Sequence, residues 1–475
     1  MKTIIRFFLL LTSVTVFSAE TKPRRLLAGA ATSNITPEIG AIIVGGFDPF
    51  PATHIHDELH ARCLVLDNGE KRIAIVVCDS LGASRQMFDE AARLVQAETG
   101  IPRECLMMSA THTHSAARAF GVNGYSTKPG DMEPYQHFMA RRIADGVKRA
   151  VNNLTPARVG WAVASEPNHV FNRRWFKKDG TIPPNPFGGQ DRVKMNPGYS
   201  ADLVQPAGPT DPEVCLVSVQ SLGGKPLAVL GNYSLHYVGD VGNGHISADY
   251  FAVFCDRLQQ LLGAERQDPA FVAMLSNGTS GNINNVDFSK PYLAAGPKYS
   301  RIRKVAEDVA QVSFAALKGI TYHDWVPLDA RFREVKLGAR RPTPEVVTRA
   351  LELVKKPRLV NGKPDLEVAY AERALRLVDA GPVLDIPVQA LRIGEVGIAG
   401  IPCETFVETG LELKAKSPFR PSFTHSIANG YYGYMPTPEH HQLGGYETWL
   451  GTNRLEAQAS VKITEALLAM WQEMR

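Results

Sequence analysis

The sequence lacks the signals that mark three large classes of protein. Its 475 residues hold only six cysteines, with no C-x-x-C pair, so neither a disulfide framework nor a cysteine-based zinc site is expected. Lys and Arg number 52 against 48 Asp and Glu, a balance that gives no argument for binding nucleic acid or an anionic membrane. No apolar run approaches the ~20 residues of a membrane-spanning helix. The composition, 44% apolar and 21% charged, is that of a globular protein, and the cysteines are predicted to be buried thiols.

The N-terminus, MKTIIRFFLLLTSVTVFSAE, has the pattern of a secretory signal peptide. A basic start is followed by an apolar stretch over residues 7–17 and by the small residues Ser18 and Ala19. We therefore predict a signal peptide over residues 1–19, a secreted or periplasmic protein, and a mature chain over residues 20–475.

Apolar runs of strand length alternate with helical patterns, which predicts an α/β architecture. RIAIVVC at 72–78 precedes the helical pattern MFDEAARLVQAETG, and CLMMS at 105–109 precedes a segment that ends in FMARRIADGVKRAVNN. Two amphipathic helices joined by a Pro/Gly/Asn turn are expected within a helical excursion at about 340–380, with Thr343 at the first N-terminus. The Gly/Pro/Asn-rich stretch 177–209 predicts a long loop.

Polar side chains follow several apolar runs at the C-terminal end of each run. The runs lead to Thr111, His112, Thr113 and His114, to His236, to Asn277, Thr279, Ser280 and Asn282, to Glu404, and to Tyr431, Tyr432 and Tyr434. Ligands bind beyond the carboxyl ends of strands in open α/β sheets, so these side chains can meet. Two imidazoles and one carboxylate are the donors of catalytic zinc sites that keep one position open. A hydrogen-bonded structural pair of histidines is the alternative for His112 and His114.

Six ordered patches together resemble the neutral/alkaline, non-lysosomal ceramidases. They are THTHS after an apolar strand, NRR at 172–174, SLH at 234–236, the NGTSGN loop, PCE at 402–404 and NGYYGYMPT at 429–437. The resemblance runs from about Ala28 to the C-terminal helix. It implies a catalytic domain of large mixed sheets flanked by helices, without the immunoglobulin-like C-terminal domain of the long ceramidases.

The resemblance implies a zinc-dependent amide hydrolase with one Zn²⁺ per chain. Its metal ligands map onto His112, His236, Glu404 and Tyr434. Tyr434 is favoured over Tyr431 because it matches the second tyrosine of the family's Y-x-x-Y pattern.

The same resemblance implies roles for three further residues. His114 would be a residue behind the ligands or one that handles protons, and Arg173 would stabilise substrate or a developing oxyanion. Ser280 aligns with the family's essential serine only by dropping a residue, because the loop reads SNGTSGNINNVDF instead of carrying G-D-V-S-P-N. A surface ion pair is the alternative for Arg173, and a polar turn residue is the alternative for Ser280.

The substrate is therefore expected to be a small-molecule or lipid N-acyl compound, with a sphingolipid as one case. A non-lipid amide or ester, such as an acylated amino sugar, is the first alternative. A secreted binding protein that has lost catalysis on the same fold is the second.

Other residues are weaker candidates. The segment THIHDELHAR, 53–62, would be a second metal or substrate contact through His54, His56, Asp57 and His60. His56 and His60 have the i, i+4 spacing of a helical zinc pair, although the resemblance makes this segment a strand. Asp79 is a catalytic acid or a hydrogen-bond anchor. His440 and His441 could border the pocket.

Overall fold

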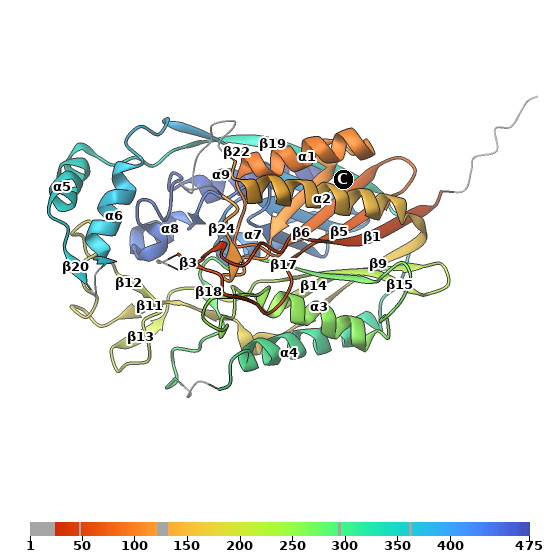
Figure 1. The fold of residues 1–475 in the computed structure, drawn as a ribbon, viewed down its shortest axis with the longest axis horizontal. Helices are drawn as coiled ribbons and strands as arrows, with labels where there is room; N and C mark the ends of the chain where they lie inside the picture. The colour runs from red at the N-terminus through yellow and green to blue at the C-terminus, as the bar shows by residue number, and fades with distance from the viewer. Residues whose placement is uncertain (1–23, 47–48, 121–131, 293–295, 361–362) are drawn as a thin grey trace, which may run out of the picture.

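The computed structural model describes residues 24–46, 49–120, 132–292, 296–360 and 363–475 (Figure 1). The predicted signal peptide, residues 1–19, lies outside the described residues. Within them the largest sheet has eight strands, in the spatial order β17 (Val272–Asn277), β15 (Pro226–Tyr233), β14 (Glu213–Ser221), β9 (Thr155–Ser165), β1 (Leu26–Asn34), β5 (His60–Asp67), β6 (Arg72–Cys78) and β7 (Leu106–Ala110). The pairs β6–β7 and β15–β17 are parallel and the other pairs are antiparallel, so the sheet is mixed, as predicted.

This sheet curls, and helices cover its outer faces. Strand β17 packs back against β5, β6 and β7. Helix α2 lies over β1, β5 and β6 and packs against α1, whereas α3 and α4 lie over β9, β14 and β17, on the opposite side of the molecule in Figure 1. These helices are α1 (Arg85–Thr99), α2 (Pro134–Asn152), α3 (Asp249–Leu261) and α4 (Ser300–Leu317).

A second sheet lies beside the first and carries the C-terminal third of the chain. Its order is β19 (Leu328–Gly338), β22 (Val383–Ile393), β23 (Val396–Ile401) and β25 (Ser422–Ser426). Strand β25 contacts β7, β15 and β17 of the main sheet. The helices of this part are α5 (Pro344–Lys355), α6 (Leu366–Leu375), α7 (Val407–Lys416), α8 (Pro438–Leu443) and α9 (Ala459–Glu473).

Short strands and single turns connect these layers. The strands are β2 (Ile42–Val44), β3 (Phe50–Pro51), β4 (His54–Ile55), β8 (Ala116–Ala117), β10 (Phe171–Asn172), β11 (Arg174–Lys177), β12 (Val193–Met195), β13 (Leu203–Pro206), β16 (His245–Ile246), β18 (Ile283–Asn284), β20 (Leu359–Val360), β21 (Lys363–Pro364), β24 (Glu404–Thr405) and β26 (Tyr434–Met435). The turns of 3₁₀ helix are η1 (Arg103–Cys105), η2 (Pro167–His169) and η3 (Tyr446–Thr448).

Twist explains how the ends of β7 and β15 can meet. Counted through the antiparallel pairs between them, these strands run in opposite directions. Neighbouring strands rotate by about 20–25°, so six pairs accumulate roughly 120–150° of rotation. That rotation turns the carboxyl end of β15 back towards the carboxyl end of β7.

Several sequence predictions about local structure are confirmed, and one is wrong. The helical excursion is present as α5 and α6, which lie apart from the sheets in Figure 1, and the Thr343 hydroxyl accepts the amide of Val346 as the N-cap of α5. All six cysteines are free and buried. The prediction that 177–209 is a long loop is wrong, because this stretch contains β12 and β13, which pair on either side of β11. No helix in the described residues is long and apolar enough to cross a bilayer.

His425 joins the two sheets and gives the fold a dependence on pH. It lies in β25, fully buried, with Nδ1 2.9 Å from the Ser109 hydroxyl of β7. Burial lowers the pKa of His425 to about 3. The neutral ring is therefore favoured in the folded state, and the stability it contributes is complete above pH ~6.5 and is lost as the pH falls towards 3.

We predict that replacing His425 with Gln reduces the loss of stability in acid. Gln keeps a hydrogen-bonding amide beside Ser109 but does not titrate, so between pH 7 and pH 5 the variant should lose about 2 kcal/mol less unfolding free energy than the wild type. Urea unfolding at the two pH values measures this difference. His137→Gln, at an exposed position on α2, is the control and should behave as the wild type does. An equal loss in His425→Gln and the wild type would contradict the prediction.

Candidate metal centre

The loops after β7 and β15 bring two histidine rings together in the interior. His112 and His236 are both buried, and their Nε2 atoms lie 3.1 Å apart. Nδ1 of His112 lies 2.7 Å from the Leu81 carbonyl oxygen, and Nδ1 of His236 lies 3.0 Å from that of Ser280. A carbonyl only accepts hydrogen bonds, so each Nδ1 carries a proton. In its neutral form, each ring therefore directs the lone pair of Nε2 towards the other ring.

The backbone holds His112 in an uncommon conformation. Its φ is 71°, in the left-handed region that residues other than glycine rarely adopt, and its amide donates to the Ser80 carbonyl at 2.8 Å. Conformations of this kind cost about 1–3 kcal/mol and concentrate at functional sites. The turn after β7 thus directs the His112 ring inward at the expense of local stability.

His114 extends the cluster towards its edge. Its Nε2 lies 3.2 Å from Nε2 of His112, its ring stacks on Tyr237 with centroids 3.6 Å apart, and it hydrogen-bonds the Gly45 backbone. A Cβ at Gly45 would lie 2.8 Å from Cβ of His114, so this approach requires glycine. Burial is the main reason that the pKa values of His114 and His236 lie well below 6.5.

Glu404 brings a carboxylate to the same point. Its Oε2 lies 3.2 Å from Nε2 of His112 and 3.7 Å from Nε2 of His236, and it has no hydrogen-bond partner among the described residues. Its other oxygen accepts the Tyr431 hydroxyl at 2.6 Å, and Tyr434 also hydrogen-bonds this carboxyl. Burial raises the pKa of Glu404, but the neighbouring His112 imidazole and these hydrogen bonds outweigh it and hold the pKa below its usual value.

These donors fit a metal ion. The ring nitrogens of His112, His114 and His236 all lie within 4.8 Å of one another and could hold a metal. Lone pairs that face each other and an orphaned carboxylate oxygen repel in a dry interior unless a cation lies among them. A cation shared by these side chains would account for the unpartnered Oε2 of Glu404.

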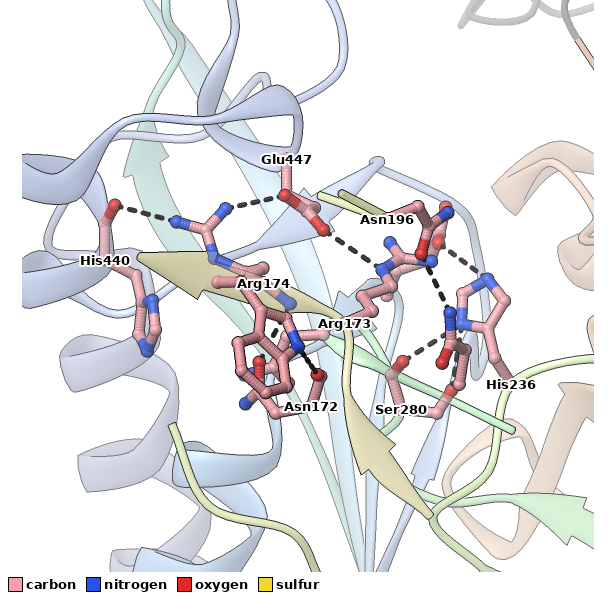
Figure 2. Close-up of polar contacts among 12 residues, drawn as sticks. Asn172, Arg173, Arg174, Asn196, His236, Ser280, His440 and Glu447 are labelled. Atoms are coloured by element: carbon pink, nitrogen blue, oxygen red, sulfur yellow. Dashed lines mark hydrogen bonds and ion pairs between the residues drawn. The ribbon is translucent and has the colours of Figure 1, made fainter. Parts of the chain in front are cut away.

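Arg173 lies beside this cluster in a buried ion-pair network (Figure 2). Its Nε donates to Glu447 at 3.0 Å, and Nη1 of Arg174 donates to the other oxygen of Glu447 at 2.6 Å, so the two arginines reach the carboxylate from its two sides. Arg173 stands over the Tyr434 ring at 5.3 Å, and its Nη2 is buried with no hydrogen-bond partner among the described residues. An ion pair is present, but it is buried, so the surface-pair alternative for Arg173 is wrong.

Ser280 contacts the cluster from the other side of His236 (Figure 2). Its carbonyl oxygen accepts Nδ1–H of His236, while its hydroxyl donates to Oδ1 of Asn277 at 2.7 Å and lies 3.4 Å from the same imidazole nitrogen. The loop after β17 therefore orients the His236 ring through a backbone atom.

The weaker candidates lie elsewhere. His60 begins β5 and His56 lies in the turn before it, so the segment leads into a strand, as the resemblance implies, and the two histidines do not form a helical pair. Asp79 is a hydrogen-bond anchor: its carboxylate accepts the His60 amide and the Arg62 guanidinium.

His440 and His441, the two adjacent histidines of α8, also have their contacts outside the cluster of His112, His114 and His236. His440 pairs with Glu408 at 3.0 Å. His441 lines a cavity of about 360 Å³ whose lining does not include the histidine cluster.

Sequence reasoning missed the residues that support the cluster. Glu447 is the single charged side chain in QLGGYETWLGTN, 442–453, a pattern that could have marked it as a buried ion-pair partner. Tyr237 directly follows SLH and could have been included with that patch. Tyr446, whose ring packs edge-on against Tyr434 with centroids 5.8 Å apart, gave no signal.

Comparison with known proteins confirms the predicted resemblance at the level of the fold. No family model matches the chain. A crystal structure of neutral ceramidase from Pseudomonas aeruginosa is similar, with a TM-score of 0.68 and 18% identity over 95% of this chain and 75% of that one. A structure of a ceramidase complexed with C2 has the same TM-score, 0.68, and 18% identity, over 94% of this chain and 75% of that one. The chain therefore has the ceramidase fold.

We predict that Glu447→Ala destabilises the protein strongly. The substitution leaves two buried guanidinium groups without their shared carboxylate, and removal of one partner from a buried ion pair costs about 3–5 kcal/mol. Urea unfolding measures the loss. Glu439→Ala, at an exposed position in the nearby helix α8, is the matched control and should cost less than ~1 kcal/mol. Equal effects of the two substitutions would contradict a central role for the Arg173–Glu447–Arg174 network.

Proposed function

We propose that this protein is a zinc-dependent hydrolase that cleaves the amide bond of an N-acyl substrate. The observation that supports the proposal best is the meeting of two neutral imidazoles, His112 and His236, with the unpartnered carboxylate of Glu404. This donor set is one that catalytic zinc sites use when they keep a coordination position open.

The spacing of the donors supports zinc. Ligands bonded tetrahedrally to zinc at about 2.0–2.1 Å lie about 3.3 Å from one another. The corresponding separations are 3.1 Å between the Nε2 atoms of His112 and His236, and 3.2 Å and 3.7 Å from these two atoms to Oε2 of Glu404. Tyr434, which hydrogen-bonds Glu404, is assigned from the resemblance as a further ligand, so the zinc would be five-coordinate with a water bound.

The metal and one histidine would divide the chemistry between them. A zinc ion held there would lower the pKa of a bound water to about 7 and polarise the substrate carbonyl. His114 is only half-buried, at the edge of the cluster, and its ring is held by Tyr237 and Gly45. As a neutral base, it would take a proton from the attacking water and deliver it to the leaving nitrogen.

Arg173 is assigned to the developing negative charge. Glu447 fixes its Nε, while the buried Nη2 has no partner among the described residues and can donate to a substrate oxygen. A fixed donor at this position costs no reorganisation during reaction, and the loss of one such donor typically costs about 3–4 kcal/mol of transition-state stabilisation.

A non-lipid amide or ester is the second candidate substrate. The Ser280 hydroxyl, the expected counterpart of the ceramidase serine, is held by Asn277 and packs behind His236. We therefore assign Ser280 to orienting the imidazole of His236 and not to contacting a ceramide head group. The substrate class therefore needs a direct assay.

We predict that the wild-type protein retains about one zinc ion per chain after dialysis against a weak chelator. His112→Ala/His236→Ala should retain none, because it removes both nitrogens that face each other at the centre of the cluster. Elemental analysis measures the content. His137→Ala/His323→Ala, at two exposed histidines, is the matched control and should keep the wild-type content. A wild type without metal would contradict the hydrolase proposal and favour a binding protein.

We predict that the wild type hydrolyses a fluorescent ceramide and that His114→Ala lowers kcat by about 10²–10⁴-fold while keeping its zinc. A short acyl amide is assayed beside the ceramide. Turnover of the short amide alone would replace the lipid substrate by a non-lipid one. Turnover of neither substrate by a zinc-loaded wild type would contradict the proposed reaction.

A further inference from the structure

A second group of three imidazoles lies at the surface, where β4 pairs with β16. His54 and His245 are register partners in this parallel pair, and His56 follows His54 at the i+2 position. Register partners of a parallel pair point to the same side of the ribbon, and the ring of His56, in the bend after β4, lies 6.3 Å from the ring of His245. The ligand nitrogens of the three rings all lie within 4.8 Å of one another, and His54 and His56 are exposed.

Tyr299 holds two of the three rings in place. The His56 ring stacks on the Tyr299 ring, with centroids 3.6 Å apart and planes 13° apart. The Tyr299 hydroxyl oxygen lies 2.5 Å from Nδ1 of His245 and accepts the Gly242 amide at 3.1 Å. A phenol oxygen can accept from both donors, and the tautomer with a proton on Nδ1 leaves the His245 Nε2 lone pair free. Hydrogen bonds of this kind orient metal-binding imidazoles and raise their basicity.

A carboxylate adds negative charge beside these rings. Oδ1 of Asp57 lies 3.6 Å from Nε2 of His56, and its other oxygen accepts the Ser247 hydroxyl. Three imidazoles with a neighbouring carboxylate suit Zn²⁺, Ni²⁺ or Cu²⁺, whereas Ca²⁺ and Mg²⁺ prefer oxygen ligands.

We propose that His54, His56 and His245 form a second divalent transition-metal site, separate from the buried cluster. A metal bound there links β4 to β16, two short strands whose pairing spans only two residues each. Ser247, directly after β16, forms a backbone bridge with Ser115 and accepts the Thr113 hydroxyl at 2.6 Å. The site therefore braces the loop that carries His112 and His114, and its metal stabilises the fold without entering the reaction.

The test is a Ni²⁺ titration of the untagged protein by calorimetry, after dialysis against a weak chelator. The wild type and His112→Ala/His236→Ala should both bind Ni²⁺ at the surface site with the same affinity. His54→Ala/His56→Ala should lose this binding, and His137→Ala should keep it. Tyr299→Phe retains the stacked ring but lacks the hydroxyl, and it should bind about 10-fold more weakly.

A thermal scan provides the second readout. Ni²⁺ should raise the Tm of the wild type and leave the Tm of His54→Ala/His56→Ala unchanged, while the two proteins should unfold at similar temperatures without metal because the substituted side chains are exposed. Ni²⁺ binding that persists in His54→Ala/His56→Ala, or is absent from the wild type, would overturn the proposal. Neither result bears on zinc in the buried cluster, which the His112→Ala/His236→Ala protein tests separately.

Discussion

The Nε2 atoms of His112 and His236 face each other across 3.1 Å in the interior, and the surrounding structure keeps them there. Carbonyl oxygens of Leu81 and Ser280 hold the protons on the far side of the His112 and His236 rings. The site is buried, so the repulsion of the lone pairs and of the Glu404 carboxylate is only weakly screened. The protein tolerates this arrangement if a cation occupies its centre, and an apo protein would be expected to relax it.

Each layer of the fold contributes one part of this arrangement. The twist of the main sheet brings the ends of β7 and β15 together, and β23 of the second sheet leads to Glu404. Arg173 then places a fixed positive charge beside the cluster. Burial is the largest cause of the lowered pKa of His236, and the charge of Arg173 lowers it further. Glu447 compensates that charge from a segment 274 residues further along the chain. A positive charge of this kind helps to keep the imidazole neutral and ready to bind a metal.

The sequence allowed the central donors to be predicted because each one follows an apolar strand. His112, His236 and Glu404 could be grouped on that pattern alone, since strand ends that share a rim bring distant residues together. Tyr434 required the family resemblance, because a phenol is an uncommon zinc ligand. The mixed order of the sheet also came from the resemblance, since alternation of strands and helices does not distinguish parallel from antiparallel pairing.

The remaining features depend on contacts that no local pattern records. Glu447 forms its two buried ion pairs only because the fold places it between Arg173 and Arg174. Spacing alone paired His56 with His60, whereas the structure places His56 beside His54 and His245, which β16 brings across from far along the chain. Strands β12 and β13 lie in a Gly/Pro-rich stretch whose composition favours turns, and their pairing with β11 outweighs that local preference.

Anomalous diffraction from crystals of the wild type, collected on both sides of the zinc absorption edge, tests the central claim most directly. We expect a zinc-specific peak within bonding distance, about 2.0–2.2 Å, of Nε2 of His112, Nε2 of His236 and a carboxylate oxygen of Glu404. A map of the intact, zinc-supplied protein without a peak there, with the two rings still turned towards each other, would contradict it.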